Sequence, residues 1–505
     1  MNQGQIVEAT SYLLSLKLGL LCLCFGMASP SLANGLRLTD LSLASPQTLQ
    51  VKVSWENAWR FGADSLTGNH DAIWLFVKYQ TANGQWRHAH LDSIGILGSN
   101  LLQASLPPDQ AGAMVSLGLE FSGQVSAEPL TIGLQSPLPS DAMAVVLMGI
   151  EMVWVPEGPF WLGDTRSFHH IRDASDEGPF FVGDAGSISP SQIDLGGEDS
   201  LSQPIPMSFP KGYQGFYLMK YELTQAQYRD FLNTLTFEQQ QARTATDPSA
   251  AVGTAAMMPS SIAGHRNGLV LASPGISGGL PARYACDGNL DGNYNQADDG
   301  SDWACSYLNW ADLCAYLDWA GLRPLTELEF EKACRGPIFP KAREFAWGTS
   351  QSIDANTLVN PGLGDERVAE MASANAGLAS HGYLGPQGPL RVGFGGNDSS
   401  SRLQLGAGYY GAAELSGNLW ELCVRIHPLG LGFLGEAGDG SLNLQGEADQ
   451  TDWPAASGAI HRGGAHNSGI IGDFRDLAIS DRFYFDLAPN QRRNTTGGRG
   501  GRSAW

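Results

Sequence analysis

The hydrophobic pattern of this chain changes character near residue 135, and that change restricts the fold more than any other feature. Residues 35–134 contain short runs of alternating or β-branched and aromatic residues, such as AIWLFVKY at 72–79, and no helical periodicity. Asn83-Gly84, between two such runs, is typical of a type I′ hairpin turn. We therefore predict an antiparallel β-sandwich over residues 35–134, followed by a proline-containing linker over 135–147.

The remaining residues, 148–505, show helix signals separated by long glycine-rich segments. Two stretches begin with a capping box, in which a threonine and the residue three positions later bond each other's backbone N–H groups. A third stretch has apolar residues at helical spacing. The predicted helices are 225–235 after Thr224, 327–335 after Thr326, and 310–320. The rest of this part is glycine-rich and irregular.

The charge of the chain limits its partners. The 505 residues include 30 Lys and Arg against 51 Asp and Glu, a formal net charge of −21. Binding to a nucleic-acid backbone needs clustered positive charge, so no nucleic-acid partner is expected. Bound cations and high solubility are compatible with this charge.

The first 33 residues are typical of a secretory signal peptide. Lys17 precedes the apolar run LGLLCLCFGM at 18–27, and the small residues Ser31 and Ala33 permit cleavage before Asn34. This run is too short to span a bilayer, and no later stretch is long and apolar enough. We therefore expect an exported protein without a membrane span, located in the periplasm, at the cell surface or outside the cell.

An acidic segment matches a twelve-residue calcium-binding loop. DGNLDGNYNQAD at 287–298 carries oxygen-bearing side chains at the ligand positions, and Gly292 stands where such loops turn sharply. A polar turn without an ion is the alternative. Cys286 and Cys305 bracket the loop, and in an oxidising compartment we expect them to form a disulfide bond. The predicted calcium ligands are Asp287, Asn289, Asp291, Asn293, Asn295 and Asp298.

Six segments of the second domain carry a further signal through their order and spacing. They are MVWVPEGPF (152–160), YELT (221–224), RPLTELEFEKACRG (323–336), FAWG (345–348), ELSGNLWELC (414–423) and RGG (462–464). Together they resemble the formylglycine-generating enzyme, or sulfatase-modifying factor, family, and the third is very similar to that family's RLPTEAEWEKAARG signature. The resemblance implies an α+β fold of the C-type-lectin type, which by itself does not imply sugar binding.

The copper site of that family has no counterpart here. Its oxidases hold copper with two cysteine thiolates shortly after the RGG segment, since soft thiolates suit Cu(I). In this chain Asp473 and Ala478 stand at about those positions, and no cysteine follows Cys423. We therefore expect no copper cofactor, and an enzymatic role is not favoured.

The resemblance also implies a second calcium site, around residues 414–421. Glu414 and Glu421 would supply carboxylates, and Gly417 and Leu419 would supply backbone carbonyl groups. Residues in or near the last two motifs form the candidate ligand surface: Trp420, His466, Asp473 and Arg475.

Three classes of function stay open at this point. The first is a non-catalytic binding or assembly component of the cell envelope, with a protein or a glycan as its ligand. The second is an enzyme of the same superfamily whose chemistry needs no thiolates. The third is a ligand-binding protein diversified by a retroelement, which a template repeat beside the gene would identify. The missing cysteine pair favours the first class.

Purified protein loaded with copper is expected to leave the cysteine of a sulfatase-motif peptide unchanged, because no thiolate pair is present to hold Cu(I). Mass spectrometry of the peptide measures the outcome, with an authentic formylglycine-generating enzyme as the positive control. Aldehyde product above the copper-only background would contradict this prediction.

Overall fold

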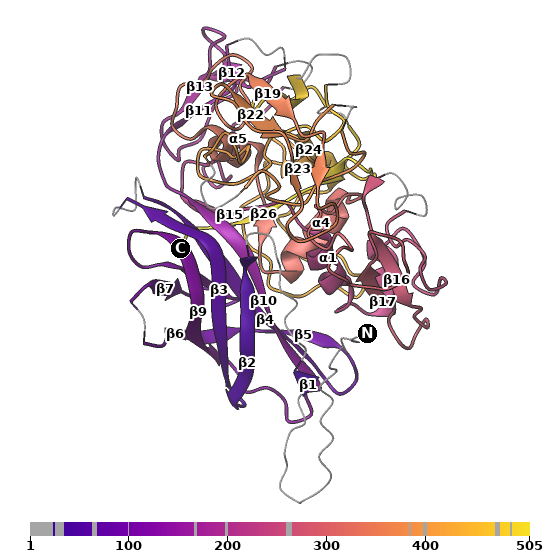
Figure 1. Ribbon diagram of the computed structural model, residues 1–505. Coiled ribbons are helices and arrows are strands. Elements are labelled where there is room, and N and C mark those ends of the chain that lie inside the picture. Colours follow the sequence, from indigo (N-terminus) through magenta and orange to yellow (C-terminus); the bar gives the residue numbers. More distant parts are fainter. Residues whose placement is uncertain are drawn as a thin grey trace, which may run out of the picture.

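The computed structural model describes residues 24–25, 35–62, 68–98, 100–165, 169–196, 200–258, 265–382, 385–396, 401–469, 475–484 and 487–505. Apart from β1 (Cys24–Phe25), the predicted signal peptide lies outside these ranges. None of the helices within them is both long and apolar enough to cross a bilayer. Figure 1 shows the N-terminal strands, in indigo and purple, against a larger part made of short helices, short strands and loops.

The N-terminal part is built from strands, as the alternating pattern predicts. They are β2 (Arg37–Ser45), β3 (Thr48–Phe61), β4 (Asn69–Gln80), β5 (Trp86–Ala89), β6 (Leu91–Ile96), β7 (Leu102–Ser105), β8 (Ala113–Leu117) and β9 (Phe121–Leu134). Ile73, Leu75 and Val77 of β4 pack into the N-terminal core, whereas Trp74 and Phe76 pack into the core of the larger part. β4 therefore has a core on each face, which explains its unbroken apolar run.

The hairpin between β4 and β5 forms at the predicted place, with Gln80 opposite Trp86. Its turn is not of type I′, so that prediction is wrong. A type I′ turn needs positive φ at both central residues, and here Gly84 has a φ of 83° whereas Asn83 has none in the positive range. The strands are joined instead through a longer loop in which Thr81 N donates to Gln85 O at 2.9 Å.

The end of the predicted linker belongs to a strand. β10 (Ala144–Val155) pairs antiparallel with β4 along residues 144–153, and its last four residues pair with β15 (Phe216–Met219). Val145 and Leu147 pack into the N-terminal core, which draws the end of the predicted linker into the sheet. The strand order is β18-β26-β15-β10-β4-β3-β9-β6, so one sheet crosses both parts of the molecule.

Among the described residues, the larger part contains the three predicted helices and one more. α1 (Gln225–Leu232), α4 (Trp310–Trp319) and α5 (Glu327–Arg335) confirm the prediction, and both predicted capping boxes are present. α2 (Phe237–Arg243) lies where the sequence analysis predicts no helix, although Thr236 and Gln239 form a capping box there. The other elements are β11 (Phe160–Leu162), β12 (Arg172–Asp173), β13 (Phe180–Val182), β14 (Ile193–Asp194), β16 (Leu269–Ser273), β17 (Arg283–Cys286), β18 (Arg323–Pro324), β19 (Gln351–Asp354), β20 (Leu358–Val359), β21 (Arg367–Val368), β22 (Ala376–Ala379), β23 (Trp420–Val424), β24 (Ala459–Arg462), β25 (Thr496–Gly497), β26 (Gly500–Ser503) and the 3-10 turns η2 (Ala456–Gly458) and η3 (Arg475–Leu477).

The cysteines correct a second prediction. The thiols that the structure describes in the larger part are all buried and free: Cys286, Cys305, Cys314, Cys334 and Cys423. The predicted bond between Cys286 and Cys305 is therefore wrong. Cys305 Sγ lies 3.8 Å from Ser306 O, and Cys286 interacts with Arg229 and Ser301, so each thiol has polar neighbours of its own.

Two side chains of β4 join the N-terminal strands to the larger part. The buried amine of Lys78 donates to Trp319 O and to Gly440 O, at 2.6 Å each. Trp74 Nε1 donates to Ala320 O at 2.8 Å. All three acceptors are backbone carbonyl groups of the larger part. Hydrogen bonds therefore add to the apolar packing between the N-terminal strands and the larger part.

Replacing Lys78 by methionine keeps most of its bulk and removes the donor of both carbonyl groups. We expect the free energy of unfolding, measured with urea, to fall by about 2–4 kcal/mol for Lys78→Met, because buried acceptors lose their partners. Lys52→Met is the matched control, since Lys52 is half-exposed and pairs with Asp40 at 2.8 Å. Its loss should stay below about 1 kcal/mol. Equal losses in the two variants would contradict the role given to Lys78.

Candidate functional site

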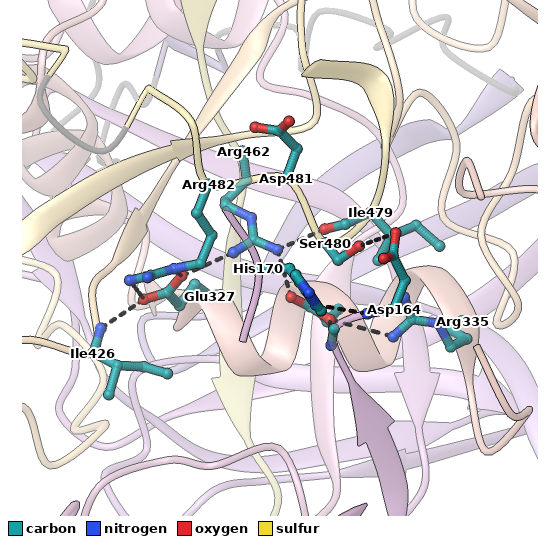
Figure 2. A network of polar contacts seen from close by, with 12 residues as sticks. Asp164, His170, Glu327, Arg335, Ile426, Arg462, Ile479, Ser480, Asp481 and Arg482 are labelled. Carbon is teal, nitrogen blue, oxygen red and sulfur yellow. Dashed lines mark hydrogen bonds and ion pairs between the residues drawn. The ribbon is translucent and has the colours of Figure 1, made fainter. Parts of the chain in front are cut away.

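A buried ionic network surrounds α5 (Figure 2). This helix is formed by the segment RPLTELEFEKACRG, the motif most similar to the family signature. Glu327, in its first turn, accepts hydrogen bonds from Arg462 Nη1 at 2.8 Å, Arg482 Nε at 2.7 Å and Ile426 N at 2.7 Å. All three charged side chains are at most 2% exposed. Burial by itself would raise the pKa of Glu327, but Arg482 and Arg462 outweigh it and hold the pKa at about 2. Glu327 is therefore an anion with a structural role.

The next turn of α5 continues this network. Glu331 Oε1 accepts from Arg462 Nη2 at 2.7 Å, and Oε2 accepts from Gly163 N at 2.8 Å and Arg335 Nη1 at 3.2 Å. Arg462 Nη2 also reaches Ile479 O. The two carboxylates thus hold together helix α5, strand β24, the loop after β11 and the C-terminal segment around residue 480.

A smaller polar group lies beside it. Asp164 Oδ2 accepts from Ser480 Oγ at 3.0 Å and from Arg343 N at 2.9 Å. The backbone N–H of Asp164 donates to His170 Nδ1 at 3.1 Å, and burial, the largest cause, lowers the pKa of His170. A neutral imidazole is needed to accept this bond, so His170 also acts as a structural residue here.

The RGG motif forms a tight turn rather than an open ligand surface. Gly463 and Gly464 have positive φ, 86° and 75°. A Cβ on Gly463 would lie 2.7 Å from Leu415 O, closer than real contacts allow. His466, just beyond the turn, donates its backbone N–H to Asn418 O at 2.8 Å, and burial lowers the pKa of its ring to about 4.

The predicted ligand surface is only partly described. Trp420 and His466 are 6% and 3% exposed, so both side chains are buried. Asp473 lies outside the described residues. Arg475 begins η3, and its side chain lies outside the described part. Of the four predicted residues, the two whose side chains are described therefore offer little surface to a ligand.

At the second calcium site implied by resemblance, an arginine supplies the positive charge. Arg499 Nε lies 2.9 Å from both carboxylate oxygens of Glu421, and Nη2 lies 2.8 Å from Oε1. The neighbouring backbone N–H of Leu419 donates to Glu222 Oε1 at 3.0 Å, and Asn418 Nδ2 donates to Glu222 Oε2. Glu421 is therefore already neutralised by a guanidinium group.

Glu414 is buried, and its Oε2 has no hydrogen-bond partner. Its Oε1 accepts from Gly393 N at 2.9 Å, and burial raises the pKa of Glu414 to about 8. Gly417 N donates to Gly463 O at 2.8 Å, which joins this turn to the RGG motif.

In the acidic loop, the fold brings three carboxylates together. One oxygen each of Asp287, Asp291 and Asp299 lies within 4.8 Å of the others. Asp287 is 5% exposed and Asp299 is fully buried, whereas Asp291 is exposed. Oδ1 of Asp287 and Oδ1 of Asp299 are buried and have no hydrogen-bond partner. Such bare anionic oxygens are costly unless a cation meets them.

The other predicted loop ligands are placed differently. Asn295 Oδ1 turns inward and accepts from Cys286 N at 3.0 Å and Arg229 Nη1 at 2.9 Å. Asn289 Oδ1 accepts from Asp291 N, and Asn293 Nδ2 donates to Asp291 Oδ2 at 3.1 Å. Asp298 is not a member of the cluster that the described residues form. Asn289 and Asn293 thus shape the loop around Asp291.

Asp299, the third member of the cluster, was not predicted because it follows the last position of the twelve-residue pattern. Gly288 N donates to Asp299 O at 3.1 Å, and Gln296 N donates to Asp299 Oδ2 at 2.6 Å. Burial is the largest cause that raises the pKa of Asp299, to about 6. The negative charges of neighbouring aspartates raise it as well. An oxygen-only set of carboxylates fits a hard divalent cation such as calcium.

A second acidic cluster, Asp318 with Asp439 and Asp449, has its carboxylates satisfied in another way. Asp318 accepts backbone N–H groups from Asp439 at 3.1 Å and Asp449 at 3.0 Å. Burial raises the pKa of Asp318 to about 7, and the amine of Lys78 lies in its field. None of these three carboxylates has a buried oxygen without a hydrogen-bond partner, so this cluster differs from the one in the acidic loop.

A cavity of about 460 Å³ lies between the N-terminal strands and the helices of the larger part. Five consecutive residues of β10, 146–150, form one wall, and Arg229 and Tyr316 of α1 and α4 stand on another. Phe76 and Trp319 supply aromatic surface. The cavity thus combines an apolar lining with a few polar groups, a composition typical of ligand sites.

The fold and these sites define a sheet-rich protein whose larger part is organised around one buried, capped helix and long loops. A family model, the Sulfatase-modifying factor enzyme 1-like domain, matches residues 141–470, about two thirds of the chain. The chain therefore belongs to the sulfatase-modifying factor family. No curated protein sequence matches it.

Removing the charge of Glu327 should destabilise the protein strongly, because two buried arginines would lose their partner. For Glu327→Gln we expect a loss of about 3–5 kcal/mol in unfolding free energy at pH 7. Glu120→Gln, at an exposed position, is the control and should change stability by less than about 0.5 kcal/mol.

The same pair of proteins gives a pH test. The pKa of Glu327 is lowered in the folded state, to about 2, so its contribution is present above the unfolded value of about 4.3 and is lost as the pH falls toward 2. The stability gap between wild type and Glu327→Gln should be constant from pH 7 to about 5 and narrow below about 4. A gap that widens on acidification would refute this assignment.

Proposed function

We propose that this protein is an exported, non-catalytic member of the sulfatase-modifying factor family, which acts as a binding or assembly component of the cell envelope. The observation that carries the proposal is the state of its cysteines. The five thiols of the larger part are buried, and burial, the largest cause, raises the pKa of each of them. A thiolate pair for Cu(I) needs deprotonated sulfur atoms, so these residues do not suit copper chemistry.

The proposed architecture is a β-sandwich followed by a C-type-lectin-like domain. A core shared by β3, β4, β8, β9 and β10 supports the first, and the order of the family motifs supports the second. The proposed ligand is a protein or a glycan of the cell envelope. The cavity between the parts is the place where the described residues offer apolar and polar groups together.

Calcium is the proposed structural cofactor, held by Asp287, Asp291 and Asp299. Two of the three carboxylates are buried and have an oxygen without a partner, and the chain already carries a large negative charge. An ion that binds only the folded protein relieves this repulsion and stabilises the fold. Extracellular calcium would then keep an exported protein in its folded state.

Calcium should raise the melting temperature of the wild-type protein over that in chelator, by an amount that corresponds to about 2.7 kcal/mol at a hundredfold excess over Kd. Asp299→Asn should lose most of this response, because one carboxylate of the cluster loses its charge. Asp298→Asn is the matched control: the neighbouring residue lies outside the cluster, and its variant should keep the response. Differential scanning calorimetry measures both.

Two outcomes would overturn the calcium proposal. The wild-type protein could melt at the same temperature with calcium and with chelator. Alternatively, Asp298→Asn could lose the response while Asp299→Asn keeps it, which would return the site to the ligands of the sequence pattern.

A further inference from the structure

Three ionisable side chains meet on one face of the sheet that crosses both parts of the molecule. They are Asp71 of β4, Glu151 of β10 and Lys220, which directly follows β15, and each is at most 7% exposed. Asp71 pairs with Val153, two positions from Glu151, and Lys220 donates its backbone N–H to Glu151 O at 2.9 Å. Paired residues, and residues two apart in a strand, share a face. The register therefore brings one amine and two carboxyl groups into a single buried site.

The charged atoms of this site are close together and shielded from water. Lys220 Nζ lies 3.2 Å from Asp71 Oδ2 and 3.7 Å from Glu151 Oε2. The ring centroid of Tyr221 lies 5.7 Å from the same amine, and Val153 belongs to an apolar core. One ammonium group balances only one of the two carboxylates. As a purely ionic site it would thus keep a surplus negative charge away from water, which is unfavourable.

The carboxyl group of Asp71 is held so that its two oxygens have different roles. Oδ1 accepts the backbone N–H of Trp59 at 3.0 Å, whereas Oδ2 faces the amine of Lys220. A donor on one oxygen draws electron density from the carboxyl carbon and stabilises negative charge on that oxygen. Oδ1 is therefore placed to become a carbonyl oxygen, and Oδ2 is placed to leave.

The protonation of the pair suits proton transfer between its members. Burial, the largest cause, raises the pKa of Asp71, although the charge of Lys220 opposes this effect. Burial lowers the pKa of Lys220, but Tyr221, Asp71 and Glu151 outweigh it and raise the pKa above its usual value. The amine thus starts as an ammonium group, beside a carboxylate that burial has made more basic. A proton passed between them leaves two neutral groups, which a dry site favours over ions.

We propose that Lys220 and Asp71 form an intramolecular isopeptide bond, with Glu151 as the proton acceptor of the reaction. The ammonium group passes one proton to Asp71 Oδ2, and the neutral nitrogen then attacks Cγ. Glu151 takes a second proton from the nitrogen and returns it to Oδ2. The bond from Cγ to Oδ2 breaks, the bond from Cγ to Nζ forms, and one water molecule leaves. One ammonium and one carboxylate thus become one amide and one water, and no further reactant is needed.

The fold supplies the conditions that this condensation needs. Holding the reacting groups in contact replaces a collision between separate molecules, and exclusion of water disfavours the reverse hydrolysis. The bond would join residues 149 positions apart. It would tie β4 of the N-terminal strands to the end of β15 in the larger part, and this link would persist when the chain unfolds.

Mass spectrometry of the denatured wild-type chain tests the proposal without requiring any variant to fold. We expect a mass lower by one water molecule than the sequence gives. After digestion with trypsin, the segments that contain Asp71 and Lys220 should appear as one branched peptide, because trypsin does not cleave after an acylated lysine. Lys52 is the internal control: its amine lies 2.8 Å from Asp40, but both side chains are exposed, so this pair should stay unlinked.

Variants assign the roles of the three groups. Asp71→Ala and Lys220→Met should regain the water and give linear peptides only. Glu151→Gln keeps the size of the side chain but lacks the basic oxygen, so the mass loss, followed over time, should be at least tenfold slower.

Wild-type protein that gives only linear peptides at residues 71 and 220 would overturn the proposal and leave a buried ion pair. A branched peptide that joins Lys220 to Glu151 would overturn the assignment of Asp71 as the carboxyl that reacts. An unchanged rate in Glu151→Gln would overturn the role given to Glu151. None of these outcomes depends on the calcium response or on the proposed binding function.

Discussion

The pairing of Glu327 with Arg462 and Arg482 is the interaction on which the larger part depends. Charges this deeply buried are unfavourable unless every one is matched, and here each carboxylate oxygen accepts at least two donors. The partners of Glu327 come from distant segments of the chain, so the network ties helix α5 to residues 426, 462 and 482. The larger part consists mostly of loops. There the network joins segments that are far apart in the sequence, which regular secondary structure does in other folds.

The second organising element is β10, which belongs to two structural parts at once. Its first half packs Leu147 into the N-terminal core, and its second half packs Val153 into a core of the larger part. The sheet therefore does not end at the boundary between the parts. Residues 146–150 of β10 line the cavity, and in the sheet β15 lies between β10 and the C-terminal strand β26.

The sequence predicted those elements whose formation depends on interactions between residues close together in the chain. The capping boxes at Thr224 and Thr326 satisfy the first N–H groups of a helix without help from the rest of the fold, and α1 and α5 begin where expected. Pairings between distant residues could not be read in this way. Asp299 belongs to the acidic cluster, and the N–H of Gly288, eleven positions earlier, donates to its backbone carbonyl group. Arg499 reaches Glu421 across 78 positions of sequence, where the resemblance implied a metal ion.

The double burial of β4 has a consequence for how the molecule holds its register. Odd-numbered side chains such as Ile73 and Leu75 belong to one core, and even-numbered ones such as Trp74 and Phe76 belong to the other. If the pairing register of β4 shifted by one residue, the side chains of each core would point into the other core. An insertion or deletion in this strand would thus damage two cores together. The N-terminal strands are also unsuited to isolation from the larger part. In the isolated strands Trp74 and Phe76 would be exposed to water, and separate molecules would associate through that apolar surface.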